Sequence, residues 1–254
     1  MSKMYSCVRA LRFPAPAGVA AMALITLALP ARATTSFANG SFQSVGSASA
    51  SFSIDYAPDA PNNVLADWTA TPSGNQILDC LVFAGATTNL CGTHAFGGGF
   101  SFWVNPGPSP DGGNYVAIDG DEGYSTPLVQ SISGLVIGQE YAVSFYQAAA
   151  QQNGFTGPTT EQWEVELGSQ SEFSTLMTDL SHEDVGWMSQ TLTFTATAAT
   201  EALSFIAVGT PNGLPPFVLL DGVSFTAVPE PATVALLGIG LIGVSIAGRF
   251  FKKR

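Results

Sequence analysis

The chain has 254 residues, of which 46% are hydrophobic and only 11% are charged, and its formal net charge is −11. All eight Lys and Arg lie near the two ends, at positions 3, 9, 12, 32, 249, 252, 253 and 254, whereas all 19 carboxylates lie between Thr34 and Gly248. This distribution argues against nucleic acid as a partner, because the acidic part has no Lys or Arg to neutralise phosphates.

The first 33 residues have the pattern of a secretory signal peptide. Basic residues up to Arg12 precede an apolar stretch, residues 17–29, and Ala31-Arg32-Ala33 matches the small-x-small cleavage rule. We therefore expect export through the Sec translocon and cleavage by signal peptidase. The mature chain would then begin at Thr34, and Cys7 would be lost.

Residues 34–227 are long enough for a single all-β domain. Several runs alternate apolar and polar residues with a period of two; in one of them Tyr141, Val143 and Phe145 share a face. Gly-, Pro- and Asn-rich clusters separate the runs and indicate turns. The expected strands are 131–135, 140–146, 161–167, 190–196, 202–208 and 218–225. Many short strands with turns between them predict an antiparallel β-sandwich.

Two cysteines, Cys80 and Cys91, remain in an oxidising compartment. Their spacing predicts one disulfide that closes a short loop. In the chain-entropy model it would stabilise the fold by roughly 3 kcal/mol. His94 lies near Cys91, so a Cys-His pair is the alternative.

The densest acidic cluster is Asp119-Gly120-Asp121-Glu122-Gly123. Carboxylates of Asp119, Asp121 and Glu122 around glycines offer hard oxygen ligands on a turn, which suits Ca²⁺. The cluster lacks the later ligands of an EF-hand. The alternative is a solvated hairpin turn.

Aromatic residues near turns are candidates for stacking on sugar rings, namely Trp103, Tyr115 and Tyr124. A loop rich in amides could hydrogen-bond to hydroxyls; it contains Gln147, Gln151, Gln152 and Asn153. Ordinary packing and loop polarity are the alternative for each residue. The strand phase of Trp163 and Trp187 predicts that both are core.

Several pieces of residues 34–227 carry a resemblance to a known family. They are Asn39-Gly40-Ser41-Phe42, Leu135-x-x-Gly138-Gln139-x-Tyr141, Trp187 before Phe194-Thr195-Ala196, and Leu220-Asp221-Gly222-Val223-Ser224-Phe225. Their order resembles the jelly-roll, galactose-binding-like domains, which include many carbohydrate-binding modules. The resemblance implies a jelly-roll β-sandwich with a structural Ca²⁺ at Gln43 and Asp221. Family members carry Glu where this chain has Gln43. The alternative role for Asp221 is to accept backbone hydrogen bonds at a strand end.

The C-terminal segment, residues 228–254, has three parts in a fixed order. Pro229-Glu230-Pro231 is followed by 17 uncharged residues, 232–248, and by a basic cluster of Arg249, Lys252, Lys253 and Arg254. As a helix the apolar part would cover about 25 Å, close to the ~30 Å of a bilayer core. The basic cluster would keep the end of the chain in the cytoplasm. We therefore expect a single transmembrane helix in the inner membrane.

This order resembles the PEP-CTERM sorting signal of Gram-negative bacteria. The resemblance implies transient anchoring in the inner membrane, cutting by an exosortase, and delivery to the cell surface or extracellular matrix. An ordinary single-span anchor with a Pro-rich stalk is the alternative.

Motifs for catalysis are scarce. The chain contains neither G-x-S-x-G nor H-E-x-x-H, and it has only two histidines. We therefore expect no enzyme. Three functions stay open: an exported structural or adhesive matrix protein, a carbohydrate-binding module for extracellular polysaccharide, and a polysaccharide hydrolase, which needs only two carboxylates.

Overall fold

The computed structural model describes residues 34–47, 55–56, 63–70, 79–82 and 101–229. Every regular element in these ranges is a β-strand, as the sequence predicts. The expected signal peptide and the expected apolar span at 232–248 lie outside the described residues. None of the described residues belongs to a helix that is long and apolar enough to cross a membrane.

The first sheet has the strand order β10-β9-β13-β7-β4, and β11 continues beyond β10 along the outer edge of β9. All of its pairings are antiparallel. In this order the strands are β10 (Gln170–Phe173), β9 (Thr159–Leu167), β13 (Thr200–Thr210), β7 (Leu128–Ser133), β4 (Thr69–Ala70) and, on the β9 edge, β11 (Met177–Asp179).

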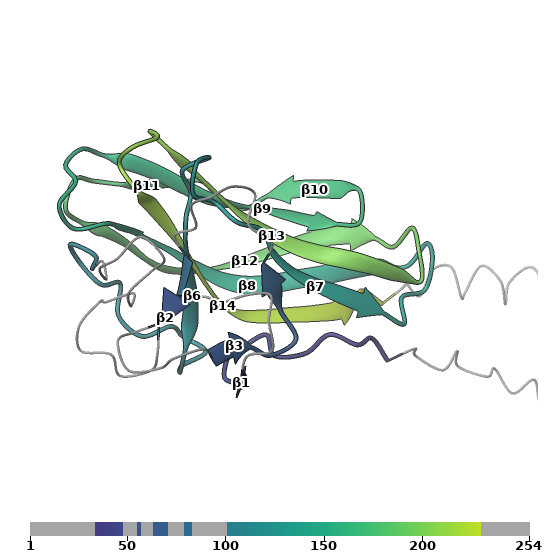
Figure 1. The fold of residues 1–254 in the computed structure, drawn as a ribbon. Coiled ribbons are helices and arrows are strands. Elements are labelled where there is room, and N and C mark those ends of the chain that lie inside the picture. The colour runs from purple at the N-terminus through teal and green to yellow at the C-terminus, as the bar shows by residue number, and fades with distance from the viewer. Residues whose placement is uncertain (1–33, 48–54, 57–62, 71–78, 83–100, 230–254) are drawn as a thin grey trace, which may run out of the picture. The chain divides into compact units, whose positions relative to one another are not determined.

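The second sheet has the order β12-β8-β14-β6-β5-β2 and is antiparallel except for the β2–β5 pair. Its strands are β12 (Asp184–Thr195), β8 (Glu140–Gln151), β14 (Pro216–Ala227), β6 (Tyr115–Asp119), β5 (Asp79–Val82) and β2 (Asp55–Tyr56). The short strands β1 (Val45–Ser47) and β3 (Asn63–Leu65) pair separately. The two large sheets lie face to face (Figure 1) and form the jelly-roll sandwich that the sequence predicts.

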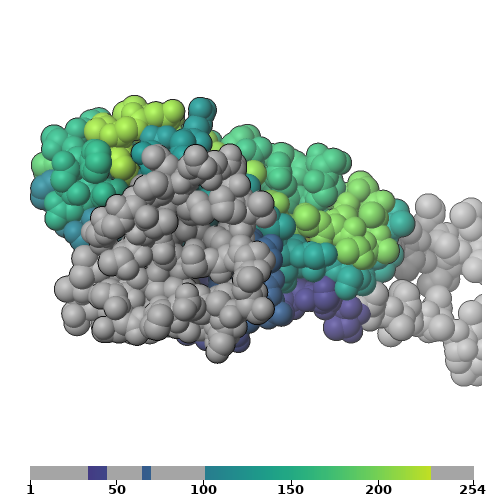
Figure 2. Space-filling model, in the orientation of Figure 1, coloured from purple at the N-terminus to yellow at the C-terminus, as the bar shows by residue number. Residues whose placement is uncertain are grey.

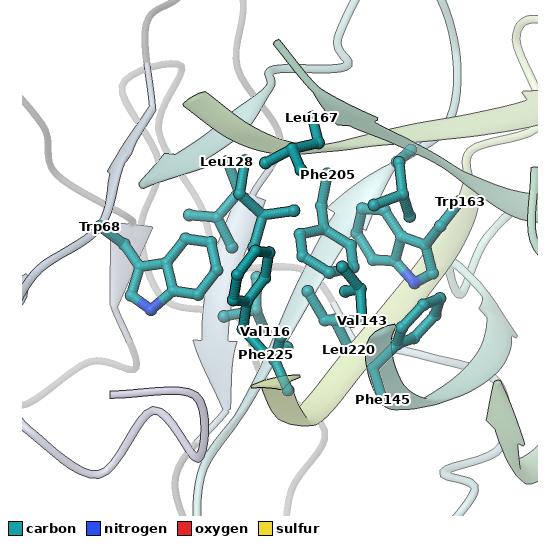
Figure 3. Close-up of a cluster of buried hydrophobic side chains, with 14 of the residues drawn as sticks. Trp68, Val116, Leu128, Val143, Phe145, Trp163, Leu167, Phe205, Leu220 and Phe225 are labelled. Carbon is teal, nitrogen blue, oxygen red and sulfur yellow. The ribbon is translucent and has the colours of Figure 1, made fainter. Parts of the chain in front are cut away.

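The core fills the space between the two sheets. In β9 every second side chain is buried, and this phase places Trp163 and Val165 inside. Trp163 meets Phe205 of β13 edge to face, with ring centroids 5.9 Å apart (Figure 3). Its Nε1 donates to the carbonyl oxygen of Leu219 in the opposite sheet, at 3.1 Å. The alternation in the sequence thus becomes one apolar interior shared by both sheets.

The N-terminal arm, residues 34–44, is hydrogen-bonded to β7 and β14. Asn39 Nδ2 donates to the carbonyl oxygens of Ser44 and Ala66, while its own carbonyl accepts from Trp68 Nε1. Next to it, the Gly40 carbonyl accepts a hydrogen bond from Val223 N at 2.9 Å. Asn39 and Gly40 therefore anchor the N-terminal arm to the sandwich, and Gly40 bonds directly to β14.

A second hydrophobic cluster covers the outer face of the β8-β14-β6 sheet. Phe217 and Leu219 of β14 pack there with Tyr115 of β6 and with Phe102, which precedes β6 in the chain. Trp187 packs on this cluster and is only half-buried. Trp163 is thus a core residue as predicted, whereas Trp187 lies on the outer face of a sheet.

Candidate distal surface

The amide-rich loop after β8 and the segment before β6 meet at one end of the sandwich. Trp103 N donates to the Gln151 carbonyl at 3.0 Å, and Asn153 N donates to the Ser101 carbonyl at 2.7 Å. The β13–β14 connection joins them, because the Pro215 carbonyl accepts from Gln152 N. The loop after β8 and the β13–β14 connection lie together at the left end of the space-filling view (Figure 2). Segments far apart in sequence thus build one loop surface.

Trp103 is the exposed aromatic residue of this surface, with 37% of its area accessible. Its Nε1 donates to the Phe155 carbonyl at 2.7 Å. Its ring lies 4.0 Å from that of His182, tilted by 35°. These contacts hold the indole in one orientation.

His182 is itself held from two sides. Its backbone N–H donates to Gln151 Oε1 at 3.2 Å, and its Nε2 lies 3.0 Å from Thr156 Oγ1. Asn153, Thr156 and Glu183 are exposed. Thr156 contacts His182, Glu183 follows it in the chain, and Asn153 N is bonded to Ser101, two residues before Trp103. We call Trp103, His182, Asn153, Thr156 and Glu183 the distal surface. An aromatic face beside amide, hydroxyl and carboxylate groups can stack on a pyranose and hydrogen-bond to its hydroxyls.

The structure uses most of the predicted amide loop internally. Gln147 and Gln151 are fully buried. Their Nε2 groups donate to the carbonyls of Thr175 and Gly157. Asn153 alone of the four amides is exposed.

The other two predicted sugar-stacking residues lie on the outer-face cluster. Tyr115 is only 4% exposed and meets Trp187 edge to face at 5.2 Å. Burial raises its pKa to about 12, and its hydrogen bond to Asn105 opposes this only weakly. Tyr124 is half-buried against the same cluster. The structure therefore does not bring Tyr115 and Tyr124 to the surface that holds Trp103.

The acidic cluster forms a turn tied together by its own carboxylates. Asp119 Oδ1 accepts from Asp121 N at 2.9 Å, and Asp121 Oδ1 accepts from Gly123 N at 2.8 Å. Asp121 Oδ2 accepts from Gly213 N at 2.6 Å, which links the turn to the β13–β14 connection. Glu122 is exposed. Burial raises the pKa of Asp119 to about 8; the hydrogen bond from Asp121 N opposes this, and the charge of Asp121 adds a smaller increase.

No three His, Cys, Asp or Glu side chains in the described part of the chain come close enough to hold a metal ion together. Asp119, Asp121 and Glu122 are thus not gathered around one point. A Ca²⁺ ion at this turn stays a prediction.

Gln43 and Asp221 both lie near the loop before β6. Gln43 Nε2 donates to the carbonyls of Ser41, Gly112 and Asn114, most closely to Ser41 at 2.6 Å. Asp221 is fully buried beside a bulge of β14. Burial raises the pKa of Asp221 to about 6. The Ser109 side chain and the Gly222 N–H lie nearby and partly oppose this increase. The Ca²⁺ ion implied there also stays a prediction.

The remaining predicted site residues fall outside what the structure describes. Cys91, Glu230, Pro231 and the basic cluster at 249–254 lie beyond the described ranges, and the side chain of Cys80 in β5 is likewise not described. The predicted disulfide therefore stays a prediction. Pro229 is the last described residue.

The distal surface and the tail lie at opposite ends of β8. At one end Val228 N donates to the Glu140 carbonyl at 2.8 Å, and at the other Trp103 N is bonded to Gln151. β8 has 12 residues and at about 3.3 Å per residue spans roughly 36 Å. Trp103 is therefore held far from the point at which the tail leaves the sandwich.

The tail matches a known family model. The PEP-CTERM protein-sorting motif covers residues 227–254, which include Pro229-Glu230-Pro231, the apolar stretch and the basic cluster. The resemblance found in the sequence is confirmed. The motif marks the chain for exosortase sorting and export to the cell surface. No curated protein matches the chain.

Solved structures with a similar fold include carbohydrate-binding proteins. A CBM4 module is 17% identical, with 75% of this chain and 99% of that chain covered and a TM-score of 0.34. TmCBM61, solved with β-1,4-galactotriose, is 14% identical over 65% of this chain and 90% of its own, with a TM-score of 0.33. Tailspike protein 4 of bacteriophage CBA120 is 9% identical over 64% of this chain, with a TM-score of 0.35, and the match spans only 20% of the tailspike chain.

Proposed function

We propose that this chain is an exported, non-catalytic matrix protein that binds extracellular polysaccharide through its distal surface. The observation that supports this most is the exposed Trp103 ring, held against His182 beside polar side chains. A ring fixed before binding loses little conformational entropy when a sugar stacks on it. Its place at the end of β8 away from Val228 would leave it accessible while the tail is still in the membrane.

A structural or adhesive role without glycan binding is the simpler alternative. A hydrolase is less well supported, because hydrolysis needs two carboxyl groups within reach of the glycosidic bond. The adjacent carboxyls of Glu161 and Asp179 are buried in the sandwich. A glycan at the distal surface would meet Glu183 instead.

Binding is tested with the full chain purified in detergent and with polysaccharides that differ in linkage and charge, measured by co-sedimentation and affinity electrophoresis. We expect retention by at least one neutral polysaccharide and a loss of affinity of about fivefold or more in Trp103→Ala, since stacking on an aromatic ring contributes about 1 kcal/mol or more. Phe173→Ala is the control, because Phe173 is also an exposed aromatic residue, 51% accessible. Equal retention of both variants would place binding elsewhere.

Sorting is tested separately in the host cell. Replacing Pro229-Glu230-Pro231 by three alanines should leave the chain uncut and membrane-bound, because the extended, helix-breaking segment is lost. Normal release of this variant would reject exosortase processing.

A further inference from the structure

Two carboxyl side chains face the interior of the sandwich from neighbouring strands. Glu161 of β9 lies opposite Met177 of β11, and Thr159 lies opposite Asp179. Side chains opposite each other in a sheet share a face, so Glu161 and Asp179 are diagonal neighbours within reach of one another. Glu161 is 0% exposed and Asp179 is 1% exposed.

Neither carboxyl group is paired with a Lys or Arg side chain. None of their four oxygens accepts a hydrogen bond of ordinary geometry, and the Thr159 hydroxyl lies close enough to Glu161 to lower its pKa. The sequence has no Lys or Arg between residues 33 and 248, and the ring of His182 packs on Trp103. Buried charges in proteins are paired or coordinate metals, because an isolated one is very costly.

Two uncharged side chains, Thr159 and Gln147, offer further oxygen atoms on the same inner side of the sheets. The Thr159 hydroxyl, 1% exposed and without a hydrogen bond of ordinary geometry, lies beside the Glu161 carboxyl. Gln147 points inward from β8; its Nε2 donates to Thr175 just before β11, and its Oε1 is buried without a partner. Glu161, Asp179, Thr159 and Gln147 thus contribute six buried oxygens, none of which makes a hydrogen bond of ordinary geometry.

We propose that Glu161 and Asp179 bind a divalent cation of the calcium type, with Thr159 and Gln147 as neutral oxygen ligands. Calcium takes six to eight oxygen ligands and tolerates irregular geometry. Two carboxylates balance its charge, which is why no third acidic group is needed. The cation would join β9 and β11 of one sheet to β8 of the other.

The nearby surface is suited to attract such an ion. Asp184 and Glu183 lie close enough to Asp179 to raise its pKa, after the larger effect of burial. Asp184 is half-buried and Glu183 is exposed. A gradient of negative charge therefore leads from solvent to the buried pair.

The test is the melting temperature of the full chain in detergent at pH 7.5, with 1 mM Ca²⁺ or with EDTA. We expect Ca²⁺ to raise the Tm by about 5 °C or more. Glu161→Gln and Asp179→Asn should abolish the rise, whereas Glu172→Gln, at an exposed position of β10, should retain it. Asp221→Asn separates this site from the one implied at Gln43 and Asp221.

Three results would overturn the proposal: no rise in the wild type, an equal rise in both pair variants, or a rise abolished by Asp221→Asn alone. Terbium gives a readout that does not depend on how stable the variants are. Trp163 is two residues from Glu161 on the same buried face of β9, so its excitation should sensitise bound Tb³⁺, and Ca²⁺ should displace the signal. Emission unchanged in Trp163→Phe would place the ion elsewhere.

Discussion

Gly40 makes the tightest backbone contact of the N-terminal arm. A Cβ atom added there would lie 1.9 Å from the Val223 carbonyl oxygen and 2.9 Å from Cζ of Phe37. Ordinary carbon contacts need about 3.5 Å, so Gly40→Ala forces the arm away from β14 by roughly 1.5 Å. The shift also breaks the hydrogen bond from Val223 N to the Gly40 carbonyl.

Overpacking of this kind costs about 1–3 kcal/mol, and the lost hydrogen bond adds about 1 kcal/mol. For a domain of this size the Tm should therefore fall by about 10 °C. Gly186→Ala is a matched control, because a Cβ atom there meets nothing within 4 Å and the backbone is not left-handed. The assay is thermal unfolding followed by circular dichroism. A Gly40→Ala variant that melts within about 2 °C of Gly186→Ala would refute the docking of the arm.

Further predictions concern the core and the buried acids. Trp163→Ala should lower the free energy of unfolding by about 3–5 kcal/mol, measured by urea unfolding, because a fully buried indole leaves a cavity; a loss below about 1 kcal/mol would contradict its core position. The phenol of Tyr115, with a pKa raised to about 12, should ionise last in an absorbance titration, and Tyr115→Phe should remove that final step. In EDTA the chain should lose stability as the pH rises from about 4 to 8. Burial raises the pKa of Glu161 to about 8 and that of Asp179 to about 7, so the folded state holds protons that the unfolded chain has released. Each pKa unit is worth about 1.4 kcal/mol, and a pH-independent stability would show that neither acid is buried in solution.

The alternation of apolar and polar residues is enough to predict the β-sandwich. The long strands β8, β9, β12, β13 and β14 each contain a run predicted from the sequence, because one face of each packs on the shared core and the period of two is visible. The short strands β10 and β11 carry no such period. Their positions depend on pairing with the edge of β9, which the sequence does not encode locally.

The candidate sites were predicted less well, for physical reasons. Trp103 was identified as a sugar-stacking candidate, but His182 was not, because their contact joins residues far apart in sequence. The predictions for Tyr115 and Trp187 are wrong because the outer face of a sheet can carry its own apolar cluster. Glu161 could have been found: it has the same phase as Trp163 and Val165 and therefore had to point inward. Asp179 has no such signal.

The sorting motif directs export of the chain, and we propose that the distal surface retains it in the polysaccharide matrix. The most direct test follows the full chain in the host cell, with wild type and Trp103→Ala compared in the polysaccharide matrix and in the medium. We expect both to be cut at the tail, the wild type to stay in the matrix fraction and Trp103→Ala to appear in the medium. An identical distribution of the two, with normal cutting, would contradict polysaccharide binding by the distal surface.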